Sequence, residues 1–157
     1  MAEPAAVYLT LPFFAKRLMN SKQIGNLTEL ETMLAFVKLG YNVLTPYGDC
    51  ERYDFVVDKD GTFVRIQCKT ASSNDEGASF RFSGRSSHKS GGRIVHHTYT
   101  KEEIDYFVTY FNGKCYLIPV EECGATKNLR ILPPKNEQAQ RIVWAKDYEL
   151  EEVVKKW

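Results

Sequence analysis

The chain has 157 residues, of which 43% are hydrophobic and 26% are charged, and its formal net charge at pH 7 is +1. This length and apolar content suit one folded domain with a buried core and exclude global disorder. No apolar run approaches the length of a membrane span, and no basic segment or cleavage site marks a signal peptide. The four cysteines form no CxxC pair. We therefore expect a cytoplasmic protein with free thiols and no membrane partner.

The first predicted elements lie in the N-terminal third of the chain. Residues 1–20 are expected to form an N-terminal extension, and residues 21–157 are expected to form a single domain. A helix should start at Ser21, or later at Thr28 if that residue begins a capping box. The helix should end just before Gly40, because glycine readily adopts the backbone conformation that terminates a helix.

The apolar residues of this helix occupy about one half of a helical wheel drawn at about 100° per residue, and that half is expected to face the core. They are Leu27, Leu30, Met33, Leu34, Phe36 and Val37. Glu29 lies within the same half, whereas Glu31 lies outside it. Burying a carboxylate among core-facing residues is costly unless a cation or a hydrogen-bond donor meets it. Glu29 is therefore the better candidate for a functional acid, and Glu31 is expected to be a cap or a surface residue.

Strand signals fill most of the remaining chain and are separated by turn residues. The predicted strands cover residues 41–45, 52–57, 62–70, 78–82, 105–111 and 114–119, with an edge strand over 129–132. Asp60–Gly61 and Asn112–Gly113 are hairpin turn signals. The tail, residues 147–156, has helical periodicity. This order of elements predicts an α/β (α+β) domain with a mixed central sheet.

A basic segment without any acidic residue lies between Glu76 and Glu102, where glycine and serine are interleaved with the cations. We interpret it as a flexible loop, and such loops often contact phosphates. The alternative is a solvated surface loop of no special role. The candidates for DNA contacts are Arg81, Arg85, His88, Lys89, Arg93 and Lys101.

One predicted hairpin gathers polar side chains that suit a metal site. The apolar residues of the strand over 62–70 point to one face, so Gln67 and Lys69 share the opposite face. Asp54 lies on the preceding strand, and antiparallel pairing brings it next to Gln67. Carboxylate and amide oxygens, with the backbone carbonyl of Cys68, are hard ligands that suit Mg²⁺. Lys69 is close enough to orient or deprotonate an attacking water and to offset charge on a phosphate.

Several motifs together resemble the PD-(D/E)XK nuclease superfamily. The main ones are Gly25-Asn-Leu-Thr-Glu29, Gly40-Tyr-Asn-Val, Arg52-Tyr-Asp54 and Gln67-Cys-Lys69. They are most similar to the group I intron-associated homing endonuclease branch, which is known for a glutamine at this motif position, and also similar to archaeal Holliday junction resolvases. The similarity spans about residues 21–150. It implies a restriction-endonuclease-like fold, with a mixed central sheet flanked by helices, and Mg²⁺-dependent hydrolysis of DNA.

The resemblance also implies a role for each matching residue. Asp54 matches the metal-binding aspartate, Lys69 the catalytic lysine and Glu29 the helix glutamate. Gln67 replaces the usual second acid and so removes one negative charge at the metal, which Glu29 is placed to supply. The implied metal ligands are Asp54, Gln67, Glu29 and the Cys68 backbone carbonyl. Mg²⁺ is the expected cofactor, with Mn²⁺ as a substitute.

The expected substrate is double-stranded DNA that is cut at specific sites, as homing endonucleases do. A small domain has little surface with which to read a long target, so we expect a homodimer or homotetramer whose copies read half-sites. Three alternatives stay open: a Holliday junction resolvase, a restriction-type nuclease, and a DNA-binding protein with a degraded catalytic site. Gln67 is the only feature that favours the last of them.

Overall fold

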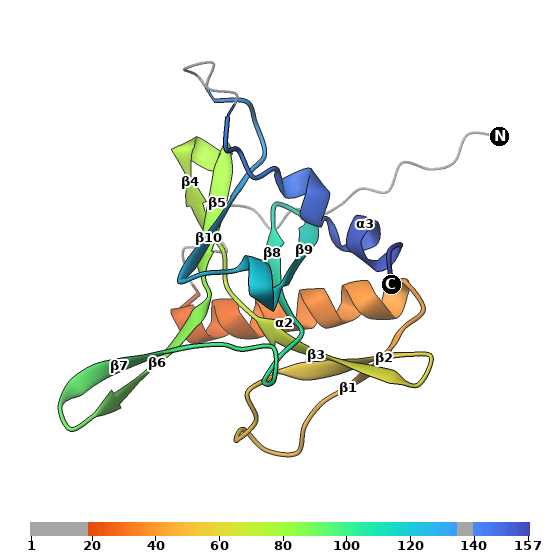
Figure 1. Cartoon of the computed structure of the whole chain (residues 1–157), viewed down its shortest axis with the longest axis vertical. Coiled ribbons are helices and arrows are strands. Elements are labelled where there is room, and N and C mark those ends of the chain that lie inside the picture. The colour runs from red at the N-terminus through yellow and green to blue at the C-terminus, as the bar shows by residue number, and fades with distance from the viewer. Residues whose placement is uncertain (1–18, 135–139) are drawn as a thin grey trace.

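The computed structural model describes residues 19–134 and 140–157 (Figure 1). The predicted extension, residues 1–20, lies outside the described residues except for its last two positions. The elements in chain order are α2 (Ser21–Lys38), β1 (Asn42–Leu44), β2 (Phe55–Lys59), β3 (Thr62–Cys68), β4 (Ser72–Asn74), η1 (Asp75–Gly77), β5 (Ser79–Ser83), β6 (Arg85–Ser90), β7 (Arg93–Thr98), β8 (Tyr106–Phe111), β9 (Lys114–Pro119), η2 (Val120–Glu122), β10 (Thr126–Arg130), η3 (Ala145–Tyr148) and α3 (Leu150–Val154). Within these ranges no helix combines the length and the apolar character needed to cross a membrane.

A five-stranded sheet in the order β1-β2-β3-β8-β9 forms the centre of the molecule. β3 and β8 are parallel, whereas the pairs β1–β2, β2–β3 and β8–β9 are antiparallel. The prediction of a mixed central sheet is therefore confirmed. Parallel neighbours need a long crossover, since the chain must return to the edge from which the first strand started. The crossover from β3 to β8 contains β4 to β7.

Two tight turns set the registers of the antiparallel pairs. Asp60 and Gly61 have φ angles of 49° and 87°, and Asn112 and Gly113 have φ angles of 49° and 81°. Positive φ at both central residues is what a type I′ turn requires, and this turn matches the twist of paired strands. The two hairpins predicted from these dipeptides are both present, as β2–β3 and β8–β9.

Different elements cover the two faces of the central sheet (Figure 1). On one face α2 and α3 form a core with it, and its largest fully buried residues are Phe36, Phe55, Ile66, Leu117 and Leu150. On the other face lies a three-stranded sheet in the order β10-β5-β4. The core between the two sheets has as its largest fully buried residues Phe80, Phe107, Ile104, Ile118 and Leu129. The two described α-helices thus lie on one face, and a second sheet covers the other.

Helix α2 buries a different stripe from the one that its apolar periodicity predicts. The buried residues are Thr28, Thr32 and Phe36. Leu30, Leu34 and Val37 are instead 62%, 47% and 55% exposed, so the prediction that they face the core was wrong. Thr32 Oγ1 donates to the Thr28 carbonyl at 2.9 Å and lies 3.3 Å from Cys68 Sγ. Because a backbone carbonyl of the preceding helical turn accepts a hydrogen bond from the hydroxyl, threonine can be buried here at little cost.

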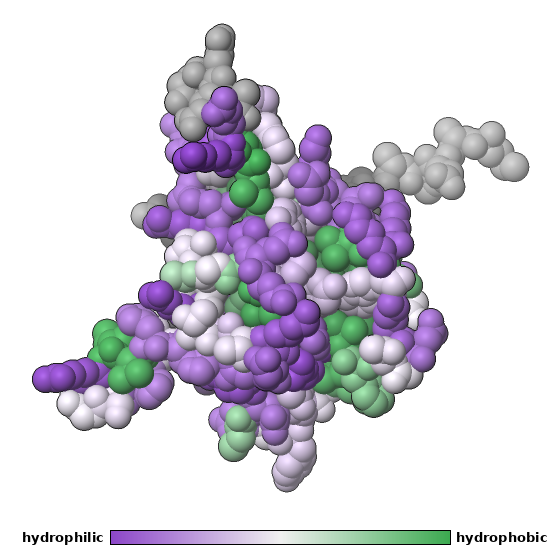
Figure 2. Space-filling view, in the orientation of Figure 1, coloured by the Kyte–Doolittle hydropathy of each residue, from purple (hydrophilic) through white to green (hydrophobic). Residues whose placement is uncertain are grey.

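Residues 85–98 form a two-stranded antiparallel ribbon, β6–β7, and the prediction of a flexible loop was wrong. Its turn is Gly91–Gly92, with φ angles of 56° and 78°. The ribbon stands clear of the body, and almost all of its side chains are exposed (Figure 2). Since both of its faces meet solvent, the ribbon lacks the alternation of apolar and polar residues by which a half-buried strand is recognised in a sequence.

Candidate active site

Asp54 lies directly before β2 and belongs to the β2–β3 hairpin. Its backbone N–H donates to the Ile66 carbonyl at 2.8 Å, which continues the pairing of the two strands by one residue. Asp54 Oδ2 accepts hydrogen bonds from Gln67 Nε2 and from the backbone N–H of Cys68, both at 2.6 Å. The structure thus places Asp54 beside Gln67, as the hairpin pairing predicts.

The Asp54 carboxyl is half-buried, and opposing effects act on its charge. Burial raises the pKa of Asp54, because the charged form loses hydration. The Cys68 N–H, the Lys69 ammonium and the Gln67 amide favour the charged form and partly offset that rise. The carboxylate is therefore held by donors on one side, in a place where a cation would stabilise it further.

Lys69 directly follows β3, and strand alternation places it on the same face as Gln67. Lys69 Nζ donates to the Arg85 carbonyl at 3.3 Å and to the Tyr99 hydroxyl at 3.4 Å. Burial lowers the pKa of Lys69, whereas the negative charge of Asp54 acts to raise it. A lysine whose pKa is lowered gives up its proton more readily, which suits the role of a general base.

Glu29 approaches the same place from helix α2. Its side chain is half-buried, and its pKa is raised first by burial and second by the negative charge of Asp54. Glu29 and Asp54 therefore act on each other electrostatically. The contact between Thr32 and Cys68 anchors the helix to β3 beside them. Of the four residues predicted to be catalytic, Asp54 and Gln67 are in direct contact, Lys69 follows Gln67 on the same face of β3, and Glu29 lies on α2 within electrostatic reach of Asp54.

The oxygen atoms that Glu29, Asp54, Gln67 and the Cys68 carbonyl offer as ligands suit a divalent cation such as Mg²⁺. Gln67 Nε2 lies 2.6 Å from Asp54 Oδ2 and 3.2 Å from the Cys68 carbonyl oxygen, so these two oxygens converge on one polar partner. Glu29 adds a second carboxylate nearby, and oxygen ligands are those that Mg²⁺ prefers. The described part of the chain holds no group of three or more His, Cys, Asp or Glu side chains suited to a metal. The candidate ligand set described here is not such a group, because two of its four members are the Gln67 amide and the Cys68 backbone carbonyl.

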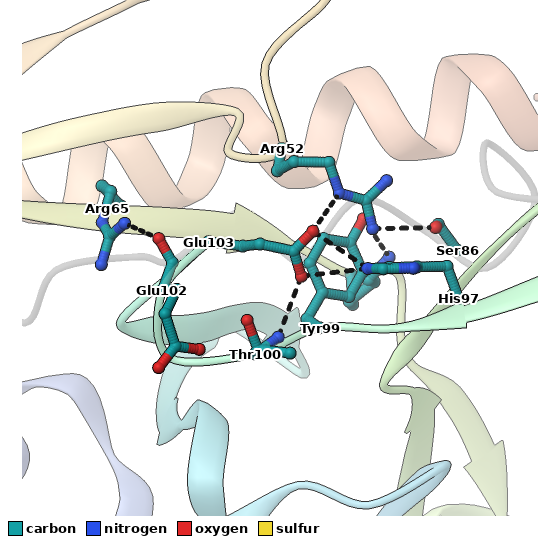
Figure 3. A network of polar contacts seen from close by, with 9 residues as sticks. Arg52, Arg65, Ser86, His97, Tyr99, Thr100, Glu102 and Glu103 are labelled. Atoms are coloured by element: carbon teal, nitrogen blue, oxygen red, sulfur yellow. Dashed lines mark hydrogen bonds and ion pairs between the residues drawn. The ribbon is translucent and has the colours of Figure 1, made fainter.

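Figure 3 shows a polar network that the sequence did not reveal. Arg52 Nε donates to Glu103 Oε1 at 3.0 Å, and Arg52 Nη2 donates to Ser86 Oγ at 3.2 Å. His97 Nε2 lies 2.9 Å from Glu103 Oε1. The Thr100 N–H donates to Glu103 Oε2 at 3.0 Å. The network ties the segment before β2 to the base of the ribbon β6–β7.

Tyr99 connects this network to Lys69. The Arg52 guanidinium lies 4.4 Å from the centroid of the Tyr99 ring, and Lys69 Nζ lies 4.6 Å from it. Both cations are attracted by the negative face of the ring. No local pattern in the sequence announces this contact, because 30 residues separate Lys69 from Tyr99. Only the crossover between β3 and β8 brings them together.

The residues predicted to contact DNA occupy three places. Four of them, all exposed, lie on the ribbon: Arg85, His88, Lys89 and Arg93. Pleating points Arg85 and Lys89 to one face of the ribbon and the other two to the opposite face. Arg81 is exposed on β5. Lys101 lies beyond the ribbon and pairs with Glu121 at 2.9 Å, so its charge is partly balanced.

Comparison with known proteins assigns the family of the chain. The model of the PD-(D/E)XK endonuclease family matches residues 19–151. The chain therefore belongs to the PD-(D/E)XK endonucleases, which generally use divalent metal ions. Among solved structures, it is similar to the bacterial homing endonuclease I-Ssp6803I, with a TM-score of 0.71, 21% sequence identity, and coverage of 88% of this chain and 95% of that chain. A comparison with curated proteins finds no match.

These matches bear on the resemblance drawn from the sequence. The predicted membership of the PD-(D/E)XK superfamily is confirmed, and so is the restriction-endonuclease-like fold. The likeness to the homing endonuclease is a likeness of fold.

Proposed function

We propose that this chain is a Mg²⁺-dependent endonuclease that hydrolyses phosphodiester bonds of double-stranded DNA at specific sites, in the manner of a homing endonuclease. The observation that carries the proposal is the placement of Asp54, Gln67 and Lys69 together on the β2–β3 hairpin, where the Asp54 carboxylate contacts the Gln67 amide. Family membership supports the nuclease activity, and the geometry supports the assignment of these residues to it.

Each residue of the cluster has a role in the proposed reaction. The proposed ligands of Mg²⁺, or of Mn²⁺ in its place, are Asp54, Gln67, Glu29 and the Cys68 carbonyl. The bound ion supplies Lewis-acid stabilisation of the charge that develops on the phosphate. Lys69 orients the attacking water and takes its proton when neutral, or offsets phosphate charge when protonated. Tyr99 and the Arg85 carbonyl hold the amino group of Lys69 in place.

Cleavage assays with and without metal test this function. The full chain is incubated with supercoiled plasmid, genomic DNA and a four-way junction, in Mg²⁺, in Mn²⁺ or in EDTA. We expect discrete fragments from the duplex substrates in either metal and no product in EDTA. Cleavage of the junction alone would indicate a resolvase, binding without cleavage would indicate a degraded site, and cleavage in EDTA would contradict the role of the metal.

Neutralising the cations of the ribbon is expected to weaken DNA binding. We propose that Arg85, Lys89 and Arg93 contact phosphates. All three are exposed on the ribbon β6–β7, which stands clear of the body of the molecule (Figure 2). Each phosphate contact contributes about −0.9 to the slope of log affinity against log salt concentration. Changing all three residues to alanine should therefore reduce the slope by up to about 2.7. Fluorescence anisotropy with a labelled duplex at several salt concentrations measures it.

A matched control for this variant removes the same charge elsewhere. Lys146, Lys155 and Lys156 are exposed near α3, on the side of the molecule away from the ribbon (Figure 1). Changing these three lysines to alanine should leave the salt slope close to that of the wild type. An unchanged slope in the ribbon variant would show that the ribbon does not contact phosphates.

We further propose that residues 21–157 form one nuclease domain, preceded by the extension 1–20, and that the chain acts as a homodimer or homotetramer in the cytoplasm. One small domain offers little surface for a long target. Leu30, Leu34 and Val37 form an exposed apolar stripe on α2 that is suited to a contact between copies. All four cysteines are free, in keeping with a reducing compartment. Sedimentation equilibrium of the full chain tests the assembly, and a monomer at all concentrations would contradict it.

A further inference from the structure

The sheet β10-β5-β4 has one apolar face and one polar face. Phe80, Phe82 and Leu129 form the apolar face, which packs on the central sheet. The side chains on the opposite face that solvent reaches are Ser72, Asn74, Arg81, Ser83, Thr126, Asn128 and Arg130, the last of which pairs with Asp75 next to β4. All residues of these three strands are described, and none of them is a carboxylate. A sheet face made of hydroxyls, amides and arginine is complementary to nucleic acid in both charge and hydrogen bonding.

Arg81 lies at the centre of this polar face. The strand registers place Ser72 of β4 and Asn128 of β10 directly on either side of it. Neighbouring strands lie about 4.8 Å apart, so the row of three residues spans roughly 10 Å. The major groove of B-DNA is about 12 Å wide and admits two paired strands. β5 and β10, which carry Arg81 and Asn128 side by side, form such a pair.

The side chains of this row are available to a ligand. Arg81 is exposed, and no carboxylate among the described residues pairs with it. Its neighbour Arg130, by contrast, pairs with Asp75 at 3.2 Å. Asn74 Nδ2 donates to Asn128 Oδ1 at 3.2 Å, which orients the Asn128 amide and leaves its NH₂ group as a donor. A recess of about 510 Å³ opens beside Arg81 and Asn128.

The sheet β10-β5-β4 is joined to the candidate active site by the chain that follows β5. β5 runs into the ribbon through Gly84, and Lys69 Nζ donates to the carbonyl of the next residue, Arg85. A Cβ at Gly84 would lie 2.2 Å from the Gly124 carbonyl oxygen and 2.7 Å from Cys123 Sγ, so the chain is tightly packed at this junction. The sheet β10-β5-β4 and the ribbon β6–β7 are thus joined beside Lys69, and both lie on the same side of the molecule (Figure 1).

We propose that the polar face of the sheet β10-β5-β4 enters the major groove of duplex DNA beside the cleaved bond and reads base edges, with Arg81 and Asn128 as the main contacts. The inference rests on the proposed nuclease function. An arginine fork makes two hydrogen bonds to guanine, and an asparagine amide makes two to adenine. In this arrangement the sheet supplies sequence preference, whereas the ribbon positions the duplex through its phosphates.

Selection from a library of duplexes with a randomised interior tests this inference. The full chain is used in Ca²⁺ instead of Mg²⁺, and the bound, uncut duplexes are sequenced. The Arg81→Lys variant keeps the charge but lacks the planar fork, so it should lose discrimination at one position of the selected motif by about 5- to 150-fold. Asn128→Ala should lose a similar factor at a nearby position. The salt dependence of Arg81→Lys should match that of the wild type.

The control is Asn42→Ala, which removes an exposed amide from the edge strand β1, away from the polar face, and should leave the selected motif unaltered. If Arg81→Lys and Asn128→Ala both select the wild-type motif with undiminished discrimination, the inference is overturned while the nuclease function stands. Binding of the wild type without any sequence preference would overturn it too. Failure of the wild type to bind any duplex would remove the proposed function as well. Both positions are exposed, so melting temperatures near that of the wild type should accompany the result.

Discussion

Replacing Asp54 by alanine is expected to abolish cleavage and to leave DNA binding largely intact. Asp54 Oδ2 is the acceptor on which Gln67 and the Cys68 N–H converge, and it is the central carboxylate of the proposed metal site. Loss of a metal's stabilisation of the transition state is worth several kcal/mol, and about 4 kcal/mol corresponds to roughly a 10³-fold slower reaction. Single-turnover cleavage in Mg²⁺ measures the rate, and anisotropy measures the affinity for DNA.

Two further variants separate chemistry from folding at this position. Asp54→Asn still offers an oxygen to the Cys68 N–H but lacks the charge, so it should fold normally and also fail to cut. Asp58→Asn changes a carboxylate on the same hairpin, where Asp58 Oδ1 accepts from the Gly61 N–H at 2.8 Å, and it should cut at close to the wild-type rate. Cleavage by Asp54→Ala at a rate near that of the wild type would show that the site is assigned wrongly.

The Lys69→Ala variant should also lose cleavage, by about 10²- to 10⁴-fold, which is the usual contribution of a positioned acid or base. Its amino group lies at the face of Tyr99 and beside the Arg85 carbonyl, and both contacts would be lost together. The metal ligands stay in place, however. Lys69→Ala should therefore bind Mn²⁺ as the wild type does, whereas Asp54→Ala should not, and a Mn²⁺ titration distinguishes the two defects.

Lys114→Ala provides the comparison for this loss of a lysine. Lys114 pairs with Glu149 at 2.6 Å on the surface, and exposed ion pairs of this kind contribute little to stability. Its removal should leave the cleavage rate unchanged. Activity of Lys69→Ala within a few-fold of the wild type, with normal DNA binding, would exclude Lys69 as the catalytic lysine.

The hairpin that carries the site could be predicted because its determinants are local. Asp60–Gly61 specifies a type I′ turn, and the turn sets which residue of β2 faces which residue of β3. Alternation along β3 then places Gln67 and Lys69 on one face. Glu29 was selected on a helical wheel whose inner half was wrong, and it is half-buried because it lies next to Thr28 in the stripe that α2 buries.

Other features could not be predicted, because their determinants lie far apart in the chain. The hydroxyl of Thr32 is buried only because β3 presents Cys68 to it, so apolar periodicity selected the exposed leucines of α2 instead. The ribbon β6–β7 has no apolar face and therefore no strand signal. Tyr99 lies 30 residues from Lys69, and Arg52 lies 51 residues from Glu103.

By itself, the sequence determined the turns, the alternation of β3, and a set of oxygen and ammonium groups that suit phosphodiester hydrolysis. Turn geometry and strand pleating act over a few residues, so their chemistry is visible in the order of the amino acids. Only the tertiary structure decided which face of α2 is buried, that Tyr99 lies against Lys69, and that a second sheet presents Arg81 and Asn128 on one face. The physical reason is the crossover between the parallel strands β3 and β8, which brings distant residues together and leaves no periodic trace in the chain.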